Sequence, residues 1–298
     1  MGNRLYKRTQ NMMGTFVTIN FTHTDDKEAH RIMGHTFKEM YKVVNLMNNF
    51  DQHSEISSLN RDGFYNNASS ETIDVIQTAL HFSELSGGAF DISVLPVLKL
   101  REESAKNGTV PSSVEMAKAL KLVNYRNIVV EGNNVQFVQA GMSVAMGGVA
   151  KGYVVDKAIE VLSCEGVKHA LVNGGGDIRV VGGTEEYPWK IGVKDPINLK
   201  NIAAVINLHN EAVATSGTYQ RNFKDIIDPI TGSPVKEVLS TTVITSKAID
   251  ADILATCVYV LGASKGMDLI EGLGNTAAYI VTQDETAFKS SLWTKNYN

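Results

Sequence analysis

Residues 147–152 read Gly147-Gly148-Val149-Ala150-Lys151-Gly152, and the fold can be worked out from the segment that they open. The sequence after them predicts a helix over about residues 150–164, which ends at Gly166. Strand-like runs follow this helix at residues 170–173, 178–181, 189–193, 202–208 and 212–215. Helices and strands are mixed in this way along the chain, which favours an α+β fold over a doubly wound parallel sheet.

The N-terminal side of this segment predicts one strand and several helices. Apolar and polar residues alternate over residues 15–21, as they do in a half-buried strand. Apolar residues recur at spacings of three and four over residues 33–47, which predicts a long amphipathic helix. A second helix is expected to end at residues 87–88, and a capping box formed by Ser112 and Glu115 begins a short third helix.

Hairpins and one long loop divide the remainder of the chain. Residues 127–138 read as a hairpin, and residues 219–239 read as a loop because proline and glycine interrupt them. A strand is expected at residues 241–245 and a helix at residues 248–261. A second hairpin, with strands at residues 277–282 and 287–293, is expected to close the chain.

Composition and charge exclude several classes of partner. With 298 residues, of which 43% are hydrophobic and 20% charged, the chain is typical of a soluble globular protein. We expect a single domain that spans residues 1–298. The formal net charge of −4 gives no general positive field, so we expect neither nucleic acid nor an anionic membrane as a partner. A polyanionic ligand would have to be neutralised locally, by a metal ion or a few placed cations.

The sequence also carries expectations about membranes and location. No stretch approaches the apolar length of a membrane span, so we expect none. The first residues are polar and lack the apolar core of a signal segment. The chain as it stands is therefore expected to be cytoplasmic. An exported or lipid-anchored protein is the alternative if a signal segment has been removed.

Three glycine-rich runs stand out, at residues 87–91, 147–152 and 173–177. Glycines allow a ligand to contact main-chain N–H and C=O groups, and a helix start adds a favourable partial charge for phosphate. Lys151 would lie in the first turn of its helix, where its ammonium could reach a phosphate. Each run alone is equally compatible with an ordinary turn, and residues 147–152 match neither a P-loop nor a dinucleotide fingerprint. Asp156, about one turn beyond Lys151, could pair with Lys151 or with solvent.

The sharpest pair of residues is Asp252 and Thr256. Residues four apart share one face of a helix, so this carboxylate and this hydroxyl would project together. Both are oxygen donors, which Mg²⁺ prefers, and phosphate oxygens commonly complete its coordination shell. A carboxylate among apolar neighbours is costly unless it is paired or bound to a cation. The alternative is that Asp252 lies on a solvated stripe with Asp250.

In combination and in order, seven runs of the chain resemble the ApbE family, the FAD:protein FMN transferases. These runs are residues 13–15, 54–60, 88–93, 147–152, 175–179, 214–219 and 227–232. The resemblance continues into the segment that carries Asp252 and Thr256, so it covers nearly the whole chain. Seven collinear motifs are far more specific than any one of them.

The resemblance implies an α+β architecture of the T-fold type, with FAD in a cleft between its parts. It implies that Mg²⁺ is held by the Gly148 carbonyl, Asp252 and Thr256, together with phosphate oxygens of FAD. It also implies the residues that line the flavin nucleotide, which are Met13, Phe50, Ala89, Phe90, Asp91, Lys151 and Ile227. The implied reaction moves FMN from FAD to a Thr or Ser hydroxyl of an acceptor flavoprotein and leaves AMP, while Lys151 spreads charge from the phosphoryl oxygens.

Two positions depart from the family's pattern. The family usually has His, a candidate general base, where this chain has Asp225, and it commonly has Asp where this chain has Ala145. A carboxylate can accept a proton, but its ordinary pKa of about 3.9 lies well below the value of about 6.5 for His. Two alternatives to the transferase therefore stay open. One is an FAD pyrophosphatase that uses water as the nucleophile, and the other is a non-catalytic FAD-binding protein.

Overall fold

A computed structural model describes residues 2–217 and 226–297 of the chain. Its contacts divide the described residues into two compact units. The sheet unit comprises the described residues of Met1–Val44, Val149–Gln220 and Lys236–Asn298. The helical unit comprises Asn45–Gly148 and the described residues of Arg221–Val235. The expectation of a single domain over residues 1–298 stays a prediction.

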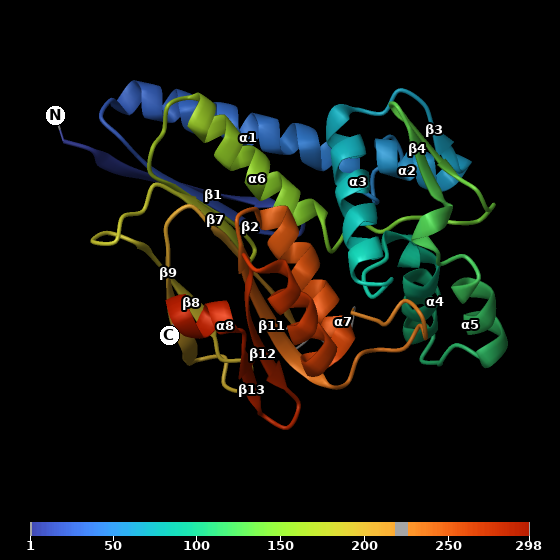
Figure 1. Cartoon of the computed structure of the whole chain (residues 1–298). Coiled ribbons are helices and arrows are strands. Elements are labelled where there is room, and N and C mark those ends of the chain that lie inside the picture. The colour runs from blue at the N-terminus through green and yellow to red at the C-terminus, as the bar shows by residue number, and fades with distance from the viewer. Residues whose placement is uncertain (1, 218–225, 298) are drawn as a thin grey trace. The chain divides into compact units, whose positions relative to one another are not determined.

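The sheet unit is built on one antiparallel sheet of eight strands, in the order β1-β2-β6-β7-β10-β11-β12-β13 (Figure 1). The strands are β1 (Arg4–Met12), β2 (Thr15–His23), β6 (Ala170–Gly174), β7 (Asp177–Val181), β10 (Ala212–Gly217), β11 (Val238–Thr245), β12 (Ala277–Thr282) and β13 (Ala287–Lys289). Met13 and Gly14 join β1 to β2, and their φ angles of 55° and 69° are typical of a two-residue hairpin turn.

Alternation along β7 shows what covers each face of this sheet. Ile178 and Val180 pack into an apolar core with residues of a separate hairpin, β8 (Trp189–Lys194) and β9 (Ile202–Leu208). The same core contains Trp293 of α8 (Ser291–Asn296). The intervening residues Asp177 and Arg179 point to the opposite face, where both bind side chains of α6 (Ala150–Cys164). The helix-covered face therefore carries charged residues inside the fold.

Three long helices belong wholly or largely to the sheet unit. They are α1 (Asp26–Met47), α6 and α7 (Ala248–Leu273). Helix α7 packs against α6, β10 and β11, and it bends at Gly262, whose φ is 81°. Among the described residues, α7 alone is long and apolar enough to cross a membrane, although the sequence led us to expect no such stretch. Since 56% of its most apolar window is buried, and a core helix passes the same test, this length carries little weight.

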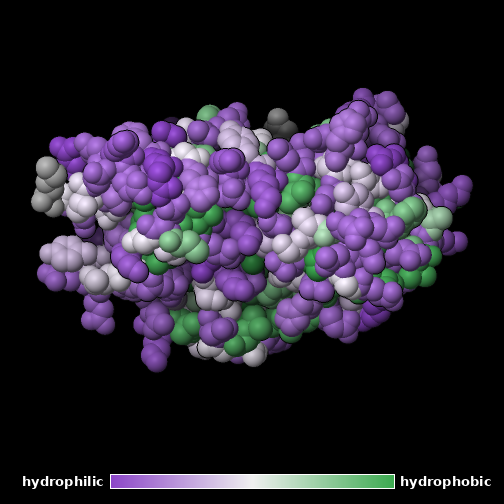
Figure 2. Space-filling view, turned by 90° about the horizontal axis from the view of Figure 1, so that it is seen from above, coloured by the Kyte–Doolittle hydropathy of each residue, from purple (hydrophilic) through white to green (hydrophobic). Residues whose placement is uncertain are grey.

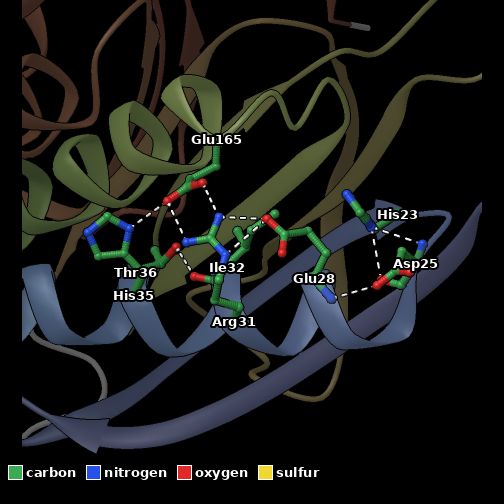
Figure 3. A network of polar contacts seen from close by, with 8 residues as sticks. All are labelled: His23, Asp25, Glu28, Arg31, Ile32, His35, Thr36 and Glu165. Carbon is green, nitrogen blue, oxygen red and sulfur yellow. Dashed lines mark hydrogen bonds and ion pairs between the residues drawn. The ribbon is translucent and has the colours of Figure 1, made fainter.

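The C-terminal end of α6 is tied to α1 by a polar network on the surface (Figure 3). Arg31 of α1 donates hydrogen bonds to Glu28, one turn earlier, and to Glu165 at the end of α6. His35 Nδ1 lies 2.7 Å from Glu165 Oε1. One carboxylate thus holds two helices that are far apart in the sequence.

The helical unit combines a small antiparallel sheet with several helices. Its strands are β3 (Phe64–Tyr65), β4 (Ile128–Glu131) and β5 (Asn134–Phe137), in the order β3-β5-β4. Its helices are α2 (Glu55–Asp62), α3 (Ser70–Leu85), η1 (Ile92–Val94), α4 (Leu95–Lys106), α5 (Ser113–Leu120) and η2 (Tyr125–Asn127). The predicted capping box of Ser112 and Glu115 begins α5. One apolar cluster of this unit joins Val97, Ala119 and Ile227.

The α+β fold class is confirmed, and so are the predicted helix at residues 150–164 and most strands that follow it. The sequence did not indicate β1, α2 or α4. The predicted strand over residues 287–293 is wrong in its second half, because Ser290 caps α8 there by accepting a hydrogen bond from Trp293 N–H. The predicted helix at residues 248–261 matches the first part of α7, whose helical geometry is interrupted at Gly262 and resumes as far as Leu273.

On the face drawn in Figure 2, hydrophilic residues cover most of the surface. Apolar residues form separate smaller patches between them. Single exposed apolar residues are normal on a folded protein, so this face alone indicates no docking surface.

Candidate functional site

The N-terminal ends of α6 and α7 meet inside the sheet unit, and each helix supplies a carboxylate to the other. Neither Val149 nor Lys247, the residues at the two N-cap positions, makes a side-chain capping hydrogen bond within the described residues. Instead, Gly152 N–H of α6 donates to Asp252 Oδ2 of α7 at 3.3 Å. The first N–H groups of a helix have no partner within it, so an acceptor placed there is stabilising.

Lys151 lies beside this contact and is bound by two carboxylates. Its ammonium forms an ion pair with Asp177 of β7 and lies 3.5 Å from Asp252 Oδ2. A quarter of the Lys151 side chain is exposed, whereas 4% of the Asp177 side chain and 6% of the Asp252 side chain are. One ammonium and two carboxylates leave this cluster with a net charge of −1 when all three are ionised. The cluster is therefore short of one positive charge.

The pKa values of the cluster reflect this imbalance. Burial raises the pKa of Asp252 to about 7, and the neighbouring charge of Asp177 adds to the rise, although Lys151 and the Gly152 N–H group oppose it. For Lys151, burial works against the charged form, but the attraction of Asp177 and Asp252 outweighs it, so the pKa of Lys151 is raised. Lys151 is thus a permanent cation, and Asp252 is a carboxylate that a further cation would help to ionise.

Thr256 lies on the next turn of α7. Its hydroxyl donates to the main-chain oxygen of Asp252 at 3.3 Å and lies 3.2 Å from Ser216 Oγ of β10. Asp252 is only 5% exposed, so the alternative that it lies on a solvated stripe with Asp250 is wrong. The predicted pair is therefore placed on the inner side of α7, facing α6 and the sheet.

Gly152 allows this close meeting of the two helices. A Cβ atom at residue 152 would lie 2.4 Å from the main-chain oxygen of Ala248 and 2.6 Å from Ile249 Cα. Real Cβ atoms essentially never approach backbone so closely, hence only glycine permits this packing. A glycine that reads as a helix start in the sequence is thus a helix-contact residue in the fold.

The residues of the cluster fit a hard divalent cation such as Mg²⁺. Across residues 2–217 and 226–297, no group of three or more His, Cys, Asp and Glu side chains could hold a metal ion. The donors would instead be mixed oxygens, from the Asp252 carboxylate and the Thr256 hydroxyl. Within the described residues, the Asp252 carboxylate accepts hydrogen bonds at Oδ2 from the Lys151 ammonium and from Gly152 N–H. Mg²⁺ takes oxygen ligands and commonly keeps positions for phosphate oxygens.

The other residues expected at the site are placed as follows. Met13 lies in the β1–β2 turn of the sheet unit. Gly148 is the last residue of the first segment of the helical unit, so its part in a metal site stays a prediction. Phe50 belongs to the helical unit and is 99% exposed. Asp225 lies outside the described residues.

The run from Ala89 to Asp91 is buried in the helical unit. Asp91 caps η1 by accepting hydrogen bonds from Ser93 N–H and the Ser93 hydroxyl, and it accepts another from Tyr125 N–H. Burial raises the pKa of Asp91 although these hydrogen bonds oppose the rise. Asp91 is thus a loop-holding residue within its unit, and its expected contact with a flavin stays a prediction.

Two further expected positions in this unit have defined surroundings. Ile227 is buried and packs with Val97 and Ala119. Ala145, which stands where the family commonly has Asp, donates its N–H to the Ile92 main-chain oxygen at 2.7 Å. The contact of Ile227 with a flavin also stays a prediction.

Sequence reasoning missed Asp177 as a partner of Lys151 and gave Asp156 no role. The only signal for Asp177 was its place at the end of the glycine-rich run 173–177, and its partner lies 26 residues away in the sequence. Asp156 binds neither Lys151 nor solvent: it forms an ion pair with Arg179, and it is 4% exposed. Both residues acquire their partners from the fold.

Comparison with known proteins gives a consistent picture. A family model described as the ApbE family matches residues 13–280. Two curated relatives are called FAD:protein FMN transferase. The one from Treponema pallidum is 26% identical over 95% of this chain and 86% of that protein. The one from Haemophilus influenzae is 29% identical over 95% of this chain and 90% of that protein. Among solved structures, the flavin transferase ApbE from Vibrio cholerae is 25% identical with a TM-score of 0.88, over 99% of this chain and 100% of that one. The ApbE protein from Thermotoga maritima is 29% identical with a TM-score of 0.88 over the same shares.

Proposed function

The chain belongs to the ApbE family, and from this membership we propose that it is an FAD:protein FMN transferase. Its substrates are FAD and an acceptor flavoprotein with a Thr or Ser hydroxyl, and its second product is AMP. The observation that carries the proposal is the cluster of Lys151, Asp177 and Asp252 where α6, α7 and β7 meet, which lacks one positive charge when all three groups are ionised. The names of the relatives support the same activity.

In this proposal the Asp252 carboxylate and the Thr256 hydroxyl hold Mg²⁺, and the Gly148 carbonyl is the predicted third protein ligand. Bound Mg²⁺ supplies positive charge to the phosphate oxygens of FAD, which carry developing negative charge during transfer. Ser216 steadies the Thr256 hydroxyl through the contact of 3.2 Å. Partners behind metal ligands orient them and commonly matter to metal affinity.

Lys151 has a separate role in the proposal. An ammonium has three N–H donors, and Asp177 and Asp252 engage two of them. The third is available to a phosphate oxygen, at the start of a helix whose N-terminus also favours anions. Asp177 keeps the ammonium in place and charged, so Lys151 can stabilise the transferring phosphoryl group without moving first.

The chemical step is a displacement at the phosphorus of the FMN half of FAD. The acceptor hydroxyl oxygen forms a bond to this phosphorus while the bond to the bridging pyrophosphate oxygen breaks, and AMP leaves with that oxygen. The hydroxyl proton passes to a general base, for which we propose Asp225. Water in place of the hydroxyl would give FMN and AMP, which is the activity of an FAD pyrophosphatase.

Mass spectrometry of an acceptor flavoprotein tests the proposal. We expect incubation with FAD, Mg²⁺ and the enzyme to add the mass of an FMN phosphoester to one Thr or Ser. FMN and AMP without any adduct on the acceptor would establish the pyrophosphatase instead. Intact FAD after prolonged incubation with Mg²⁺ and the acceptor would support a non-catalytic FAD-binding protein.

Asp225 can be tested in the same assay. We expect Asp225→Asn to slow transfer by about 10²–10⁴-fold, the usual contribution of a general base. The affinity for FAD, measured by flavin fluorescence, should stay as in the wild type, because the variant keeps the size and polarity of the side chain. Unchanged transfer by this variant would mean that another group accepts the proton.

A further inference from the structure

A second buried carboxylate mirrors Asp252 on the neighbouring helix. Asp156 of α6 accepts hydrogen bonds from the first two N–H groups of α7, those of Ala248 at 2.9 Å and Ile249 at 3.0 Å. Arg179 of β7 donates to Asp156 Oδ1 at 2.8 Å. Each helix is therefore capped by an Asp of the other, Asp252 toward α6 and Asp156 toward α7.

The two caps differ in charge balance. Asp156 and Arg179 neutralise one another, so this pair needs no further cation. The cluster of Lys151, Asp177 and Asp252 has a net charge of −1 when all three groups are ionised. An internally balanced, buried ion pair that binds two main-chain N–H groups has the chemistry of a structural clamp rather than of a ligand site.

The clamp acts one turn away from the proposed metal carboxylate. Ile249 precedes Asp252 by three residues, so the N–H groups that Asp156 holds belong to the turn on which Asp252 rests. In the same way, Gly152, whose N–H donates to Asp252, lies one turn before Asp156 on α6. The first turns of α6 and α7 are thus held together by two reciprocal sets of contacts, from Asp252 to α6 and from Asp156 to α7.

Strand β7 anchors both halves of this arrangement. Asp177 binds Lys151, and Arg179, two residues later on the same face of the strand, binds Asp156. Gly152 brings the two helices close enough for both caps to form. A shift of Asp156 or Arg179 would therefore move the first turn of α7 relative to Lys151.

We propose that Asp156 and Arg179 are positioning residues that fix the first turn of α7, and with it the Asp252 carboxylate, in the geometry that binds the metal. This inference rests on the proposed function, because that function assigns Asp252 to the metal. It predicts an effect on metal affinity that is separable from the affinity for the flavin.

Titration calorimetry of Mg²⁺ into the FAD-loaded protein tests the inference. We expect Asp156→Asn and Arg179→Met each to weaken Mg²⁺ binding by about tenfold or more, the usual effect of residues that orient a metal ligand. Arg179→Lys keeps the positive charge beside Asp156 and should restore most of the affinity. The affinity for FAD in the absence of Mg²⁺ should not change in any of the three.

Glu165→Gln is the matched control, since it removes an ion-paired carboxylate at the other end of α6. It should leave Mg²⁺ affinity unchanged. A second readout needs no metal: amide hydrogen exchange over residues 248–252 should be faster in Asp156→Asn, while exchange near Glu165 stays the same. This separates a local clamp from a general loss of stability.

Three results would overturn the inference. The first is wild-type Mg²⁺ affinity in folded Asp156→Asn and Arg179→Met. The second is an equal loss of affinity in Glu165→Gln, which would make the effect one of general stability. The third is the absence of Mg²⁺ binding by the wild type with FAD. A wild type that binds Mg²⁺ normally but forms no FMN adduct would instead overturn the proposed function and leave the positioning role standing.

Discussion

At each end of helix α6 a carboxylate lies beside a cationic side chain, in the interior of the fold at one end and near the surface at the other. At the N-terminal end, Asp252 is buried against Gly152 and Lys151, and burial raises its pKa to about 7. At the C-terminal end, Glu165 binds Arg31 and His35 on the surface (Figure 3). Hydrogen bonds from Arg31 and then His35 lower the pKa of Glu165 to about 2, because desolvation there is small.

The difference teaches that burial together with an uncompensated charge, rather than the presence of a cation, separates a candidate site from a surface network. Burial makes the ionised form of a carboxylate unfavourable and raises its pKa, and a bound cation can stabilise this ionised form. The half-buried Glu165 carboxylate already has Arg31 and His35 as partners, and ion pairs near the surface usually contribute little to stability. Function is therefore expected at one end of α6 and modest stabilisation at the other.

The largest expected effect lies at the buried end. Asp252→Ala should reduce Mg²⁺-dependent FMN transfer by about 10²–10³-fold or more, because it removes the only charged ligand proposed for the metal. Transfer is measured by the rate of FMN adduct formation at saturating FAD and Mg²⁺. Asp250→Ala, two residues earlier on α7, is the control and should keep near-wild-type rates. Equal transfer rates for the two variants would contradict the proposal that Asp252 has a special role in binding the metal.

A change of one methyl group tests the packing of the same end. Gly152→Ala should lower the free energy of unfolding by about 1–3 kcal/mol, since its Cβ would lie 2.4 Å from the main-chain oxygen of Ala248 and force the helices apart. Urea unfolding measures the change. Gly34→Ala is the matched control, because a Cβ at this helical position meets nothing within 4 Å. It should stabilise by about 0.5–1 kcal/mol through helix propensity.

The smallest effect is expected at the exposed end. Glu165→Gln should cost about 0.2–1 kcal/mol of unfolding free energy at neutral pH, as exposed ion pairs do. The pKa of Glu165 is lowered in the fold from 4.5 to about 2, so its contribution is complete above about pH 4.5 and is lost as the pH falls toward 2. The stability difference between wild type and variant, measured by urea unfolding across this range, should therefore shrink with acidification. A difference that grew instead would contradict the lowered pKa.

Much of the fold could be predicted because its signals are local. The helix at residues 150–164 was predicted with its bounds, since glycine and apolar periodicity mark both its ends. Strand β1 was missed, because it precedes the first clear alternation and all its residues before Met12 are exposed or half-buried. Helix α4 was missed because its cues, Pro96 at its start and a mixed pattern of burial, do not give a clear apolar stripe.

The candidate site was predictable in its residue types and only partly in its contacts. Lys151, Asp252 and Thr256 were identified from glycine context and helical spacing, and the fold brings Lys151 and Asp252 together across 101 residues of sequence. Whether Asp252 faced solvent or the interior could not be decided from spacing, because its helix is apolar on nearly every side. Burial of the side chain decided it.

The sequence by itself determined the fold class, the family and the chemical kinds of group at the start of α6. These follow from periodicity, turn residues and the order of motifs, all of which are written along the chain. Only the tertiary structure decided that Asp177 holds Lys151, that Asp156 with Arg179 holds the first turn of α7, and that one cluster is left short of a positive charge. The physical reason is that desolvation and ion pairing depend on which residues are neighbours in space. Asp177 and Lys151 are 26 residues apart in the sequence, and Asp156 and Ala248 are 92 residues apart.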